Sequence, residues 1–311
     1  MPVPLLKFLA CLWWTLCWVG AVQAASVVVV TSEHSAGYTD AAGALVGELE
    51  RSGVPRSDIA LLSVPESAGV AVAGEAAPRL FVTLGADALK QMLLRDVRVP
   101  VLAALIPRSS VERVRKESGN KTAAVTALYL DQPFGRQLDL LRLALPAAKR
   151  IGVLWGTESV QQQSLLLPAL SARGLSLVSG SVALNGSLFG GLKTVLDDAD
   201  VLLAIADPQV FNSATISSIL LTTYRAHTPV LAFSPAYVKA GALLSLHTTP
   251  TQVGLQAATM ARTLLQGGAL PPAQYPAEFS IGVNEHVARS LGLALDAATL
   301  TDSLRRMDKR P

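Results

Sequence analysis

Cysteine is nearly absent from this sequence of 311 residues. Its two cysteines, Cys11 and Cys17, both lie in the apolar segment at the N-terminus, so the chain beyond residue 24 has no thiol. This excludes disulfide bonds, thiolate nucleophiles and cysteine-ligated metals from that part of the chain. The four histidines are scattered without His-x-x-x-His spacing, so we expect no metal site.

An excess of charge of one sign is also missing. Of the 26 Lys and Arg residues one lies in residues 1–24, and none of the 23 Asp and Glu residues does, which leaves 25 basic against 23 acidic side chains. No stripe of Lys and Arg with interleaved aromatic residues occurs. Because nucleic-acid binding needs such a basic surface, we expect no nucleic-acid partner.

Signatures of catalysis and of cofactor binding are missing as well. The sequence has no G-x-S-x-G, P-loop, G-x-G-x-x-G or H-E-x-x-H motif. The paired carboxylates Asp197 and Asp198 are expected to lie solvated at a helix end. The sequence therefore favours a binding protein without a cofactor over an enzyme.

The N-terminus has the pattern of a secretory leader. Lys7 precedes an apolar run over residues 8–22, which is followed by Val22-Gln23-Ala24. The run is shorter than the roughly 20 residues that span a bilayer, so we expect cleavage after Ala24 and a periplasmic protein. A retained membrane anchor and a lipid attached at Cys11 are the alternatives. No other segment is long and apolar enough to span.

Two series of strands and helices follow the leader. Strand-like runs of the first series are residues 26–31, 59–64, 80–84, 99–106 and 123–129. Their continuous apolar character is typical of strands buried on both faces of a parallel sheet. A helical segment at 133–145 then leads to a second series over residues 151–247. Two doubly wound three-layer (αβα) Rossmann-like lobes with a gap between them are the expected fold.

The segment after the second series is a predicted helix. Thr249, Pro250 and Gln252 form a capping box with proline at the first helical position. Val253, Ala257, Met260 and Leu264 then make one apolar stripe, which we interpret as core. Gly267-Gly268 ends the helix, and a strand-like FSIGV and a short helical segment follow.

Six stretches in register resemble the substrate-binding proteins of bacterial ABC importers, in the branch of the tryptophan/tyrosine importer component. They are VTLGADAL (82–89), VPVLAALIP (99–107), LPAAKRIGVLWG (145–156), DADVLLAIADPQVFN (198–212), TPVLAFSPAYVKAGAL (228–243) and SIGVNEHVARSLGL (280–293). The resemblance implies a type I periplasmic-binding-protein fold that closes about a hinge on a small molecule. It also implies an ABC permease as partner and a protein that acts as a monomer.

The resemblance divides the chain at expected boundaries. Residues 1–24 are the signal peptide, 25–131 and 249–270 form lobe 1, 132–248 and 271–300 form lobe 2, and 301–311 form a tail. Two departures from the family pattern matter for the ligand. Pro107-Arg108 stands where relatives commonly have an Asp-Pro turn, and Ser32-Glu33-His34 is unlike the usual first loop. Tryptophan is therefore not carried over as the ligand.

Candidate ligand contacts in the second lobe follow its strands. Asp207 either takes a ligand ammonium or bonds its own backbone in a turn. Asn212 is placed to cap the helix over residues 213–225, with its amide hydrogen as a second possibility. Ser234 and Tyr237 either bond and stack on a planar ligand or form a turn hydroxyl and a partly buried ring. Trp155 faces the cleft or the core, and we favour the cleft.

Candidate contacts in the first lobe are fewer. Gly85 and Ala86 end a strand and open a helix, so backbone N–H groups there are placed to hold an anion. Glu33 and His34 follow Ser32 after the first strand, but neighbours on an extended segment point to opposite faces, which argues against joint acid-base or metal chemistry.

We interpret the chain as a periplasmic receptor for an amino acid, a small heteroaromatic or a similar solute. Two other classes remain open. One is a sensory ligand-binding protein that passes occupancy to a signalling partner, and the other is an exported α/β enzyme.

Overall fold

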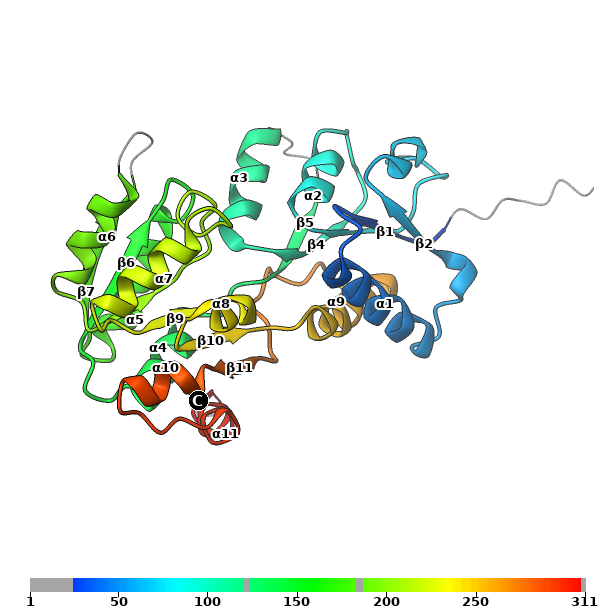
Figure 1. Cartoon of the computed structure of the whole chain (residues 1–311). Helices are drawn as coiled ribbons and strands as arrows, with labels where there is room; N and C mark the ends of the chain where they lie inside the picture. Colours follow the sequence, from blue (N-terminus) through cyan, green and yellow to red (C-terminus); the bar gives the residue numbers. More distant parts are fainter. Residues whose placement is uncertain (1–24, 120–122, 183–186, 309–311) are drawn as a thin grey trace, which may run out of the picture.

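The computed structural model describes residues 25–119, 123–182 and 187–308, which form two α/β lobes side by side (Figure 1). Lobe 1 is built on a parallel sheet with the strand order β2-β1-β3-β4-β5. Its strands are β1 (Val27–Thr31), β2 (Ile59–Ser63), β3 (Leu80–Leu84), β4 (Val101–Ile106) and β5 (Val125–Tyr129). The sequence-based prediction of a doubly wound α/β fold is confirmed.

Helices cover both faces of the lobe 1 sheet. They are α1 (Ala36–Arg51) and α9 (Pro250–Leu265) on one face, and α2 (Ala86–Leu93) and α3 (Arg108–Ser118) on the other. Successive strand residues point to opposite faces, so Val27 and Val29 pack under α1 and α9 while Val28 and Val30 pack under α2 and α3. This is why the strand is apolar without alternation.

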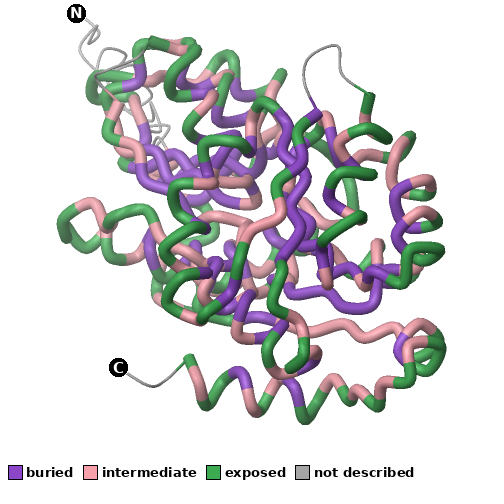
Figure 2. Tube along the Cα trace, turned by 90° about the vertical axis from the view of Figure 1, so that its left-hand side faces the viewer, coloured by how far each residue is buried: buried purple, intermediate pink, exposed green. Residues whose placement is uncertain are grey.

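Lobe 2 repeats the plan with one more strand. The sheet order is β11-β10-β9-β8-β6-β7, and β11 alone is antiparallel to its neighbour. The strands are β6 (Arg150–Trp155), β7 (Ser176–Ser181), β8 (Val201–Leu203), β9 (Val230–Ala232), β10 (Leu244–His247) and β11 (Ser280–Val283). Figure 2 shows the buried interior of the lobes and the exposed outer faces of the helices.

Helices also enclose the lobe 2 sheet. One face carries α4 (Phe134–Ala144), α5 (Gln163–Ser171), α10 (Glu285–Ser290) and α11 (Ala297–Asp308), and the other carries α6 (Leu188–Leu196), α7 (Ile216–Arg225) and α8 (Pro235–Ala240). A short 3-10 turn, η3 (Val160–Gln162), directly precedes α5. Two further 3-10 turns, η1 (Arg56–Asp58) and η2 (Glu66–Gly69), lie in lobe 1.

The predicted capping box begins α9 as expected. Thr249 Oγ1 accepts from the Gln252 N–H at 3.2 Å, and Gln252 Oε1 accepts from the Thr249 N–H at 2.9 Å. The helix then returns to lobe 1 and packs against α1 (Figure 1). Gly254 allows the close approach, since a Cβ there would lie 2.3 Å from the carbonyl oxygen of Ala41.

Three segments cross between the lobes: 130–133, 248–249 and 275–279. The third differs from the boundary we expected, because Gln274 stays with lobe 1. Its N–H donates to Ala127 O at 2.9 Å, and its carbonyl accepts from Tyr129 N at 3.0 Å. β5 is an edge strand with unpaired backbone groups, and the returning chain satisfies them. The chain therefore leaves lobe 1 after Gln274 and not at residue 271.

We expected a tail from residue 301 onward, and this prediction is wrong for residues 301–308. Helix α11 continues to this residue, because Leu300 and Leu304 are buried in lobe 2 and Arg136 pairs with Asp308. The proposed leader, residues 1–24, and residues 309–311 lie outside the described residues. In the described part of the chain, no helix has the length and hydropathy needed to cross a membrane.

Candidate ligand site between the lobes

The two sheets reverse their winding at matching places. The reversal falls between β1 and β3 in lobe 1 and between β6 and β8 in lobe 2. Ligands of open α/β sheets bind outside the carboxyl ends of the strands at such switch points. Ser32 and Gly85 follow the strands at the first, and Gly156 and Asp207 lie beyond the strands at the second.

Two hydroxyl groups lie together at the switch point of lobe 1. Ser32 Oγ accepts from the Ala88 N–H of α2 at 2.9 Å and interacts with the Tyr38 phenol. Gly85 has a φ of 91°, and a Cβ there would meet the Tyr38 hydroxyl at 2.5 Å, so both backbone and space require glycine. Burial, together with the negative charge of Glu33, raises the pKa of Tyr38 and keeps the phenol protonated.

The other lobe 1 candidates lie around this hydroxyl pair. Glu33 and His34 are exposed on the loop before α1. Ala86 is partly buried at the first position of α2. We predicted an anion site at the first turn of α2, and Ser32 already occupies one of its N–H groups, that of Ala88.

A buried carboxylate lies at the switch point of lobe 2. Asp207 is 2% exposed. Its Oδ2 accepts from the backbone N–H groups of Glu158 at 3.2 Å and Ser159 at 2.8 Å, and its Oδ1 accepts from Gln209 N at 2.9 Å. Gly156 makes room, because a Cβ there would lie 2.3 Å from Asp207 Oδ1. Of the two roles that we left open for Asp207, the structure shows the turn, extended to the loop after β6.

The remaining lobe 2 candidates also have local partners. Asn212 Oδ1 accepts from Ala214 N at 2.9 Å and its Nδ2 donates to Pro208 O at 2.8 Å, which orders the turn before α7. Ser234 Oγ accepts from Ala236 N at 3.2 Å and caps α8.

The Tyr237 ring belongs to a group of three aromatic rings. It lies 5.1 Å from the Phe233 ring centroid and 6.3 Å from that of Phe211. Burial raises the pKa of Tyr237. Phe233 also lines a pocket in the gap between the lobes, so the aromatic group adjoins that pocket.

The favoured cleft position of Trp155 is not what the structure shows. Its side chain is 1% exposed, packs in the core under α4 and α5, and donates from Nε1 to Ser179 Oγ at 2.9 Å. Alternation along β6 accounts for this, since Val153 and Trp155 point into the same core face.

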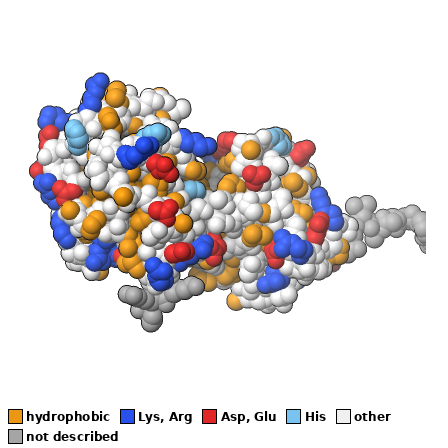
Figure 3. All heavy atoms as spheres, turned by 60° about the horizontal axis from the view of Figure 1, so that its bottom comes forward, with side chains coloured by type: hydrophobic (Ala, Val, Ile, Leu, Met, Phe, Trp, Pro, Cys, Tyr) orange, Lys and Arg blue, Asp and Glu red, His pale blue; other side chains and the backbone are white. Residues whose placement is uncertain are grey.

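The rim of the gap is bridged from α3 to the loop after β6. Arg113 Nε lies 3.2 Å from Glu158 Oε1, and Ser110 Oγ donates to Glu158 Oε2 at 3.5 Å. Side chains of both lobes line a groove here. Figure 3 shows the molecule from the side of α10 and α11, where basic and acidic side chains are interspersed. Because Asp207 holds the backbone of Glu158, the lobe 2 switch point also positions this bridge.

The base of the gap holds a small pocket with an internal volume of about 20 Å³. Asp131 and Gln132 of the first crossing segment, Tyr275 of the third, and Gln162 and Phe233 of lobe 2 contribute to it. The remaining walls are mostly aliphatic. Sequence reasoning missed Asp131, Gln132, Gln162, Phe233 and Tyr275. The only signal was the run YLDQP, which places Asp131 two residues after the end of β5.

A hydrogen-bond network ties the three crossing segments together beneath this pocket. Gln132 Nε2 donates to Thr248 Oγ1 at 2.5 Å, and Thr248 Oγ1 donates to Glu278 O at 3.0 Å. Arg136 donates to Gln132 Oε1 at 2.7 Å and to Pro276 O at 2.8 Å. We call these groups the hinge network.

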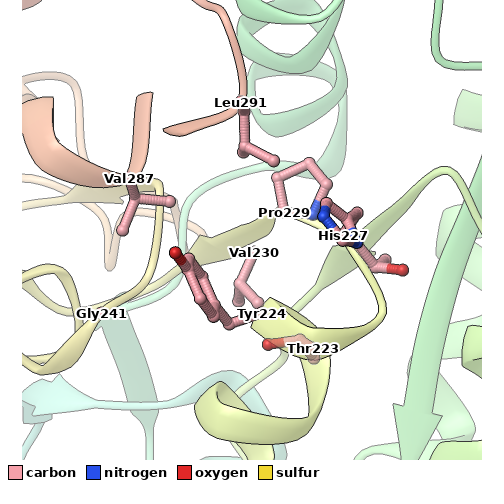
Figure 4. A pocket seen from close by; sticks show the side chains of 9 residues that line it. Thr223, Tyr224, His227, Pro229, Val230, Gly241, Val287 and Leu291 are labelled. Atoms are coloured by element: carbon pink, nitrogen blue, oxygen red, sulfur yellow. The ribbon is translucent and has the colours of Figure 1, made fainter. Parts of the chain in front are cut away.

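Another pocket lies on lobe 2 away from the gap. Figure 4 shows Tyr224, His227, Pro229 and Leu291 around it. Pro229 directly precedes β9, so this pocket lies at the amino ends of the strands, opposite the edge at which open α/β sheets bind their ligands. In the part of the chain that the structure describes, no group of three His, Cys, Asp or Glu side chains is placed to hold a metal ion.

Comparisons with known proteins agree with this fold. Over 207 residues the chain is 23% identical to a tyrosine-binding protein of Clostridioides difficile, a match over 65% of this chain and 57% of that relative's length. The ligand-free, open structure of a substrate binding protein with adhesive properties from Clostridium difficile aligns with a TM-score of 0.66 at 19% identity, covering 87% of this chain and 96% of the other.

A second solved structure is a Streptococcus pneumonia ABC domain in complex with L-Trp. It aligns with a TM-score of 0.61 at 16% identity and covers 88% of this chain and 96% of that one. The family model of the ABC transporter substrate binding proteins matches residues 75–303. With the two-lobe fold, this match over most of the sequence means that the chain belongs to the ABC transporter substrate binding protein family.

Proposed function

We propose that this protein is the solute-binding component of an ABC importer and that it closes its two lobes on a small organic molecule. One observation carries the proposal. The carboxyl ends of β4 and β5 in lobe 1 and of β6, β8 and β9 in lobe 2 open on the same gap, where residues of both lobes line a rim groove and a basal pocket. A ligand held there gains contacts from both lobes only when they close.

The proposed solute is an amino acid or a small heteroaromatic. The tyrosine-binding and L-Trp-bound relatives support this class, as do the aromatic rings beside the basal pocket. Of the contacts predicted from sequence, we retain Ser32, Gly85 and Ala86 at the lobe 1 switch point and Tyr237 in lobe 2. Glu33 and His34 lie at the rim of the same switch point. In this proposal Asp207, Asn212 and Ser234 shape the lobe 2 loops and do not bind the solute.

A thermal-shift screen of amino acids, nucleobases and vitamins tests this proposal. A ligand at about 100 times its Kd stabilises the native state by about 2.7 kcal/mol, which raises the melting temperature. We expect one or a few amino acids to do so and to be recovered unchanged after incubation. Conversion of the bound compound would favour the exported-enzyme alternative, and a flat screen would contradict the receptor function.

Export and delivery complete the proposal. The leader pattern of residues 1–24 supports export to the periplasm with cleavage after Ala24, and the family supports an ABC permease as the partner. The mass of the secreted protein tests the cleavage. Ligand uptake by membrane vesicles that contain the permease, measured with and without this protein, separates the importer role from a sensory one.

A further inference from the structure

The basal pocket contains a carboxyl group that is poorly matched to its surroundings. Asp131 is partly buried, and its Oδ2 accepts from the backbone N–H of Arg108 at 2.6 Å. None of the ion pairs found among the described residues includes Asp131. The Arg108 guanidinium is instead bonded to Glu112 at 2.8 Å and to the Tyr275 hydroxyl at 3.1 Å. Burial raises the pKa of Asp131, because removal from water disfavours its charged form.

The same pocket contains an amide donor with no partner. Gln162 is 5% exposed, and its Nε2 makes no hydrogen bond. A buried polar group without a partner destabilises the folded protein, so its retention in a ligand pocket points to a partner supplied from outside the chain. Gln162 belongs to lobe 2, whereas Asp131 belongs to the crossing segment that leaves lobe 1.

We propose that the basal pocket binds the head group of an α-amino acid, with Asp131 accepting from the ligand ammonium and Gln162 Nε2 donating to the ligand carboxylate. The inference deepens the proposed function and rests on it. A primary ammonium next to an anionic oxygen satisfies both groups at once, since one needs a cation and the other an acceptor. The side chain of the amino acid then extends from the pocket toward the rim groove.

The pocket also links the head group to the hinge. Gln132, which lines the pocket, belongs to the hinge network and adjoins Asp131 in the chain. The ammonium site therefore sits on a segment that moves when the lobes close. Asp207, the ammonium partner considered from sequence, already accepts three backbone N–H bonds and has less capacity for another donor.

The test compares two pocket variants with two exposed controls by calorimetric titration. Asp131→Asn keeps an acceptor for the Arg108 N–H but loses the charge, and Gln162→Met keeps the volume but loses the donor. Asp302→Asn and Gln266→Met make the same changes at exposed positions of the chain. The probes are the twenty L-amino acids and, for the one that binds most tightly, its deaminated analogue.

We expect Asp131→Asn to weaken binding of that amino acid by about 10- to 100-fold and Gln162→Met to weaken it by about tenfold, because hydrogen bonds to charged groups are worth about 1.5–3 kcal/mol. The deaminated analogue should bind the native protein weakly, and Asp131→Asn should weaken it little further, because the two changes remove the same contact. Both controls should bind like the native protein. Melting curves check that each variant is folded.

Three results would overturn the inference. Asp131→Asn could bind as tightly as the native protein, the deaminated analogue could match the amino acid, or a nucleobase or vitamin could bind while no amino acid does. The last result leaves the receptor function standing. Binding of no solute at all would instead contradict the proposed function, and the head-group site with it.

Discussion

Lobes 1 and 2 share a strand order, but different polar side chains lie at their switch points. In lobe 1 two hydroxyls, Ser32 and Tyr38, meet beside Gly85. In lobe 2 one buried carboxylate, Asp207, holds three backbone N–H groups of two loops. A hydroxyl can rotate to donate or accept, whereas a carboxylate held by N–H groups is fixed in one arrangement. Lobe 1 therefore keeps the more adaptable polar surface, and lobe 2 the more rigid one.

This difference also bears on where the ligand is recognised. The lobe 2 switch point, which the fold rule favours, is occupied by the protein's own backbone. Two poorly satisfied polar groups, Asp131 and Gln162, lie instead at the base of the gap, beside the hinge network. In the same topology, polar groups at a strand end can therefore be used either to bind the ligand or to hold the surrounding loops in place.

The largest expected effect is the loss of the carboxylate in lobe 2. Asp207→Ala leaves the N–H groups of Glu158 and Ser159 without their acceptor, so we expect a loss of about 3–5 kcal/mol in the free energy of unfolding. Urea denaturation measures it. Asp198→Ala, an exposed acidic position in the same lobe, is the control and should cost under about 0.5 kcal/mol. A loss below about 1 kcal/mol for Asp207→Ala would mean that the two loops keep their conformation without this carboxylate.

A second substitution tests whether the lobes depend on the hinge network. Arg136→Met removes the bonds to Gln132 and Pro276 and the pair with Asp308, so we expect a loss of about 2–3 kcal/mol. It should also broaden the distribution of lobe-to-lobe distances, measured by small-angle scattering. Arg289→Met, at an exposed position of lobe 2, is the control. A stable variant with an unchanged scattering profile would show that the network does not restrain the hinge.

The corresponding change in lobe 1 should cost less. Ser32→Ala removes the acceptor of the Ala88 N–H at the start of α2, for which helix caps suggest about 1 kcal/mol. Comparison with Asp207→Ala in the same denaturation series measures the asymmetry of the lobes directly. Equal losses for the two variants would contradict the proposed asymmetry between the lobes.

The smallest expected effect is a dependence on pH. The pKa of Asp131 in the folded protein lies above its unfolded value of about 3.9, so the folded protein binds this proton more tightly than the unfolded chain does. The free energy of unfolding therefore falls as pH rises from the unfolded pKa through the folded one. In Asp131→Asn this contribution to the fall in stability should be missing. Melting curves between pH 3.5 and 7 should therefore show the variant gaining stability relative to the native protein as the pH approaches 7. Parallel curves would contradict it.

Sequence reasoning predicted the repeated α/β plan because buried parallel strands such as 80–84 are continuous apolar runs and because the capping box of Thr249 is local. It placed Asp207 at a strand end, whereas β8 ends earlier, at Leu203, and it left the role of Asp207 open. The partners in the hinge network, Gln132, Thr248 and Asp308, are far apart in the chain. Nothing in their neighbourhood indicates that they meet, and a single Asp such as Asp131 has no motif that reveals its burial.

The central claim is that a solute in the gap closes the lobes. The chain beyond residue 24 has no cysteine, so spin labels can be placed at Lys90→Cys in α2 and Ser217→Cys in α7, both exposed. Pulsed dipolar spectroscopy then measures the distance between the lobes with and without the amino acid that raises the melting temperature most. We predict a shorter and narrower distance distribution with that amino acid. An unchanged distribution at saturation would contradict the account.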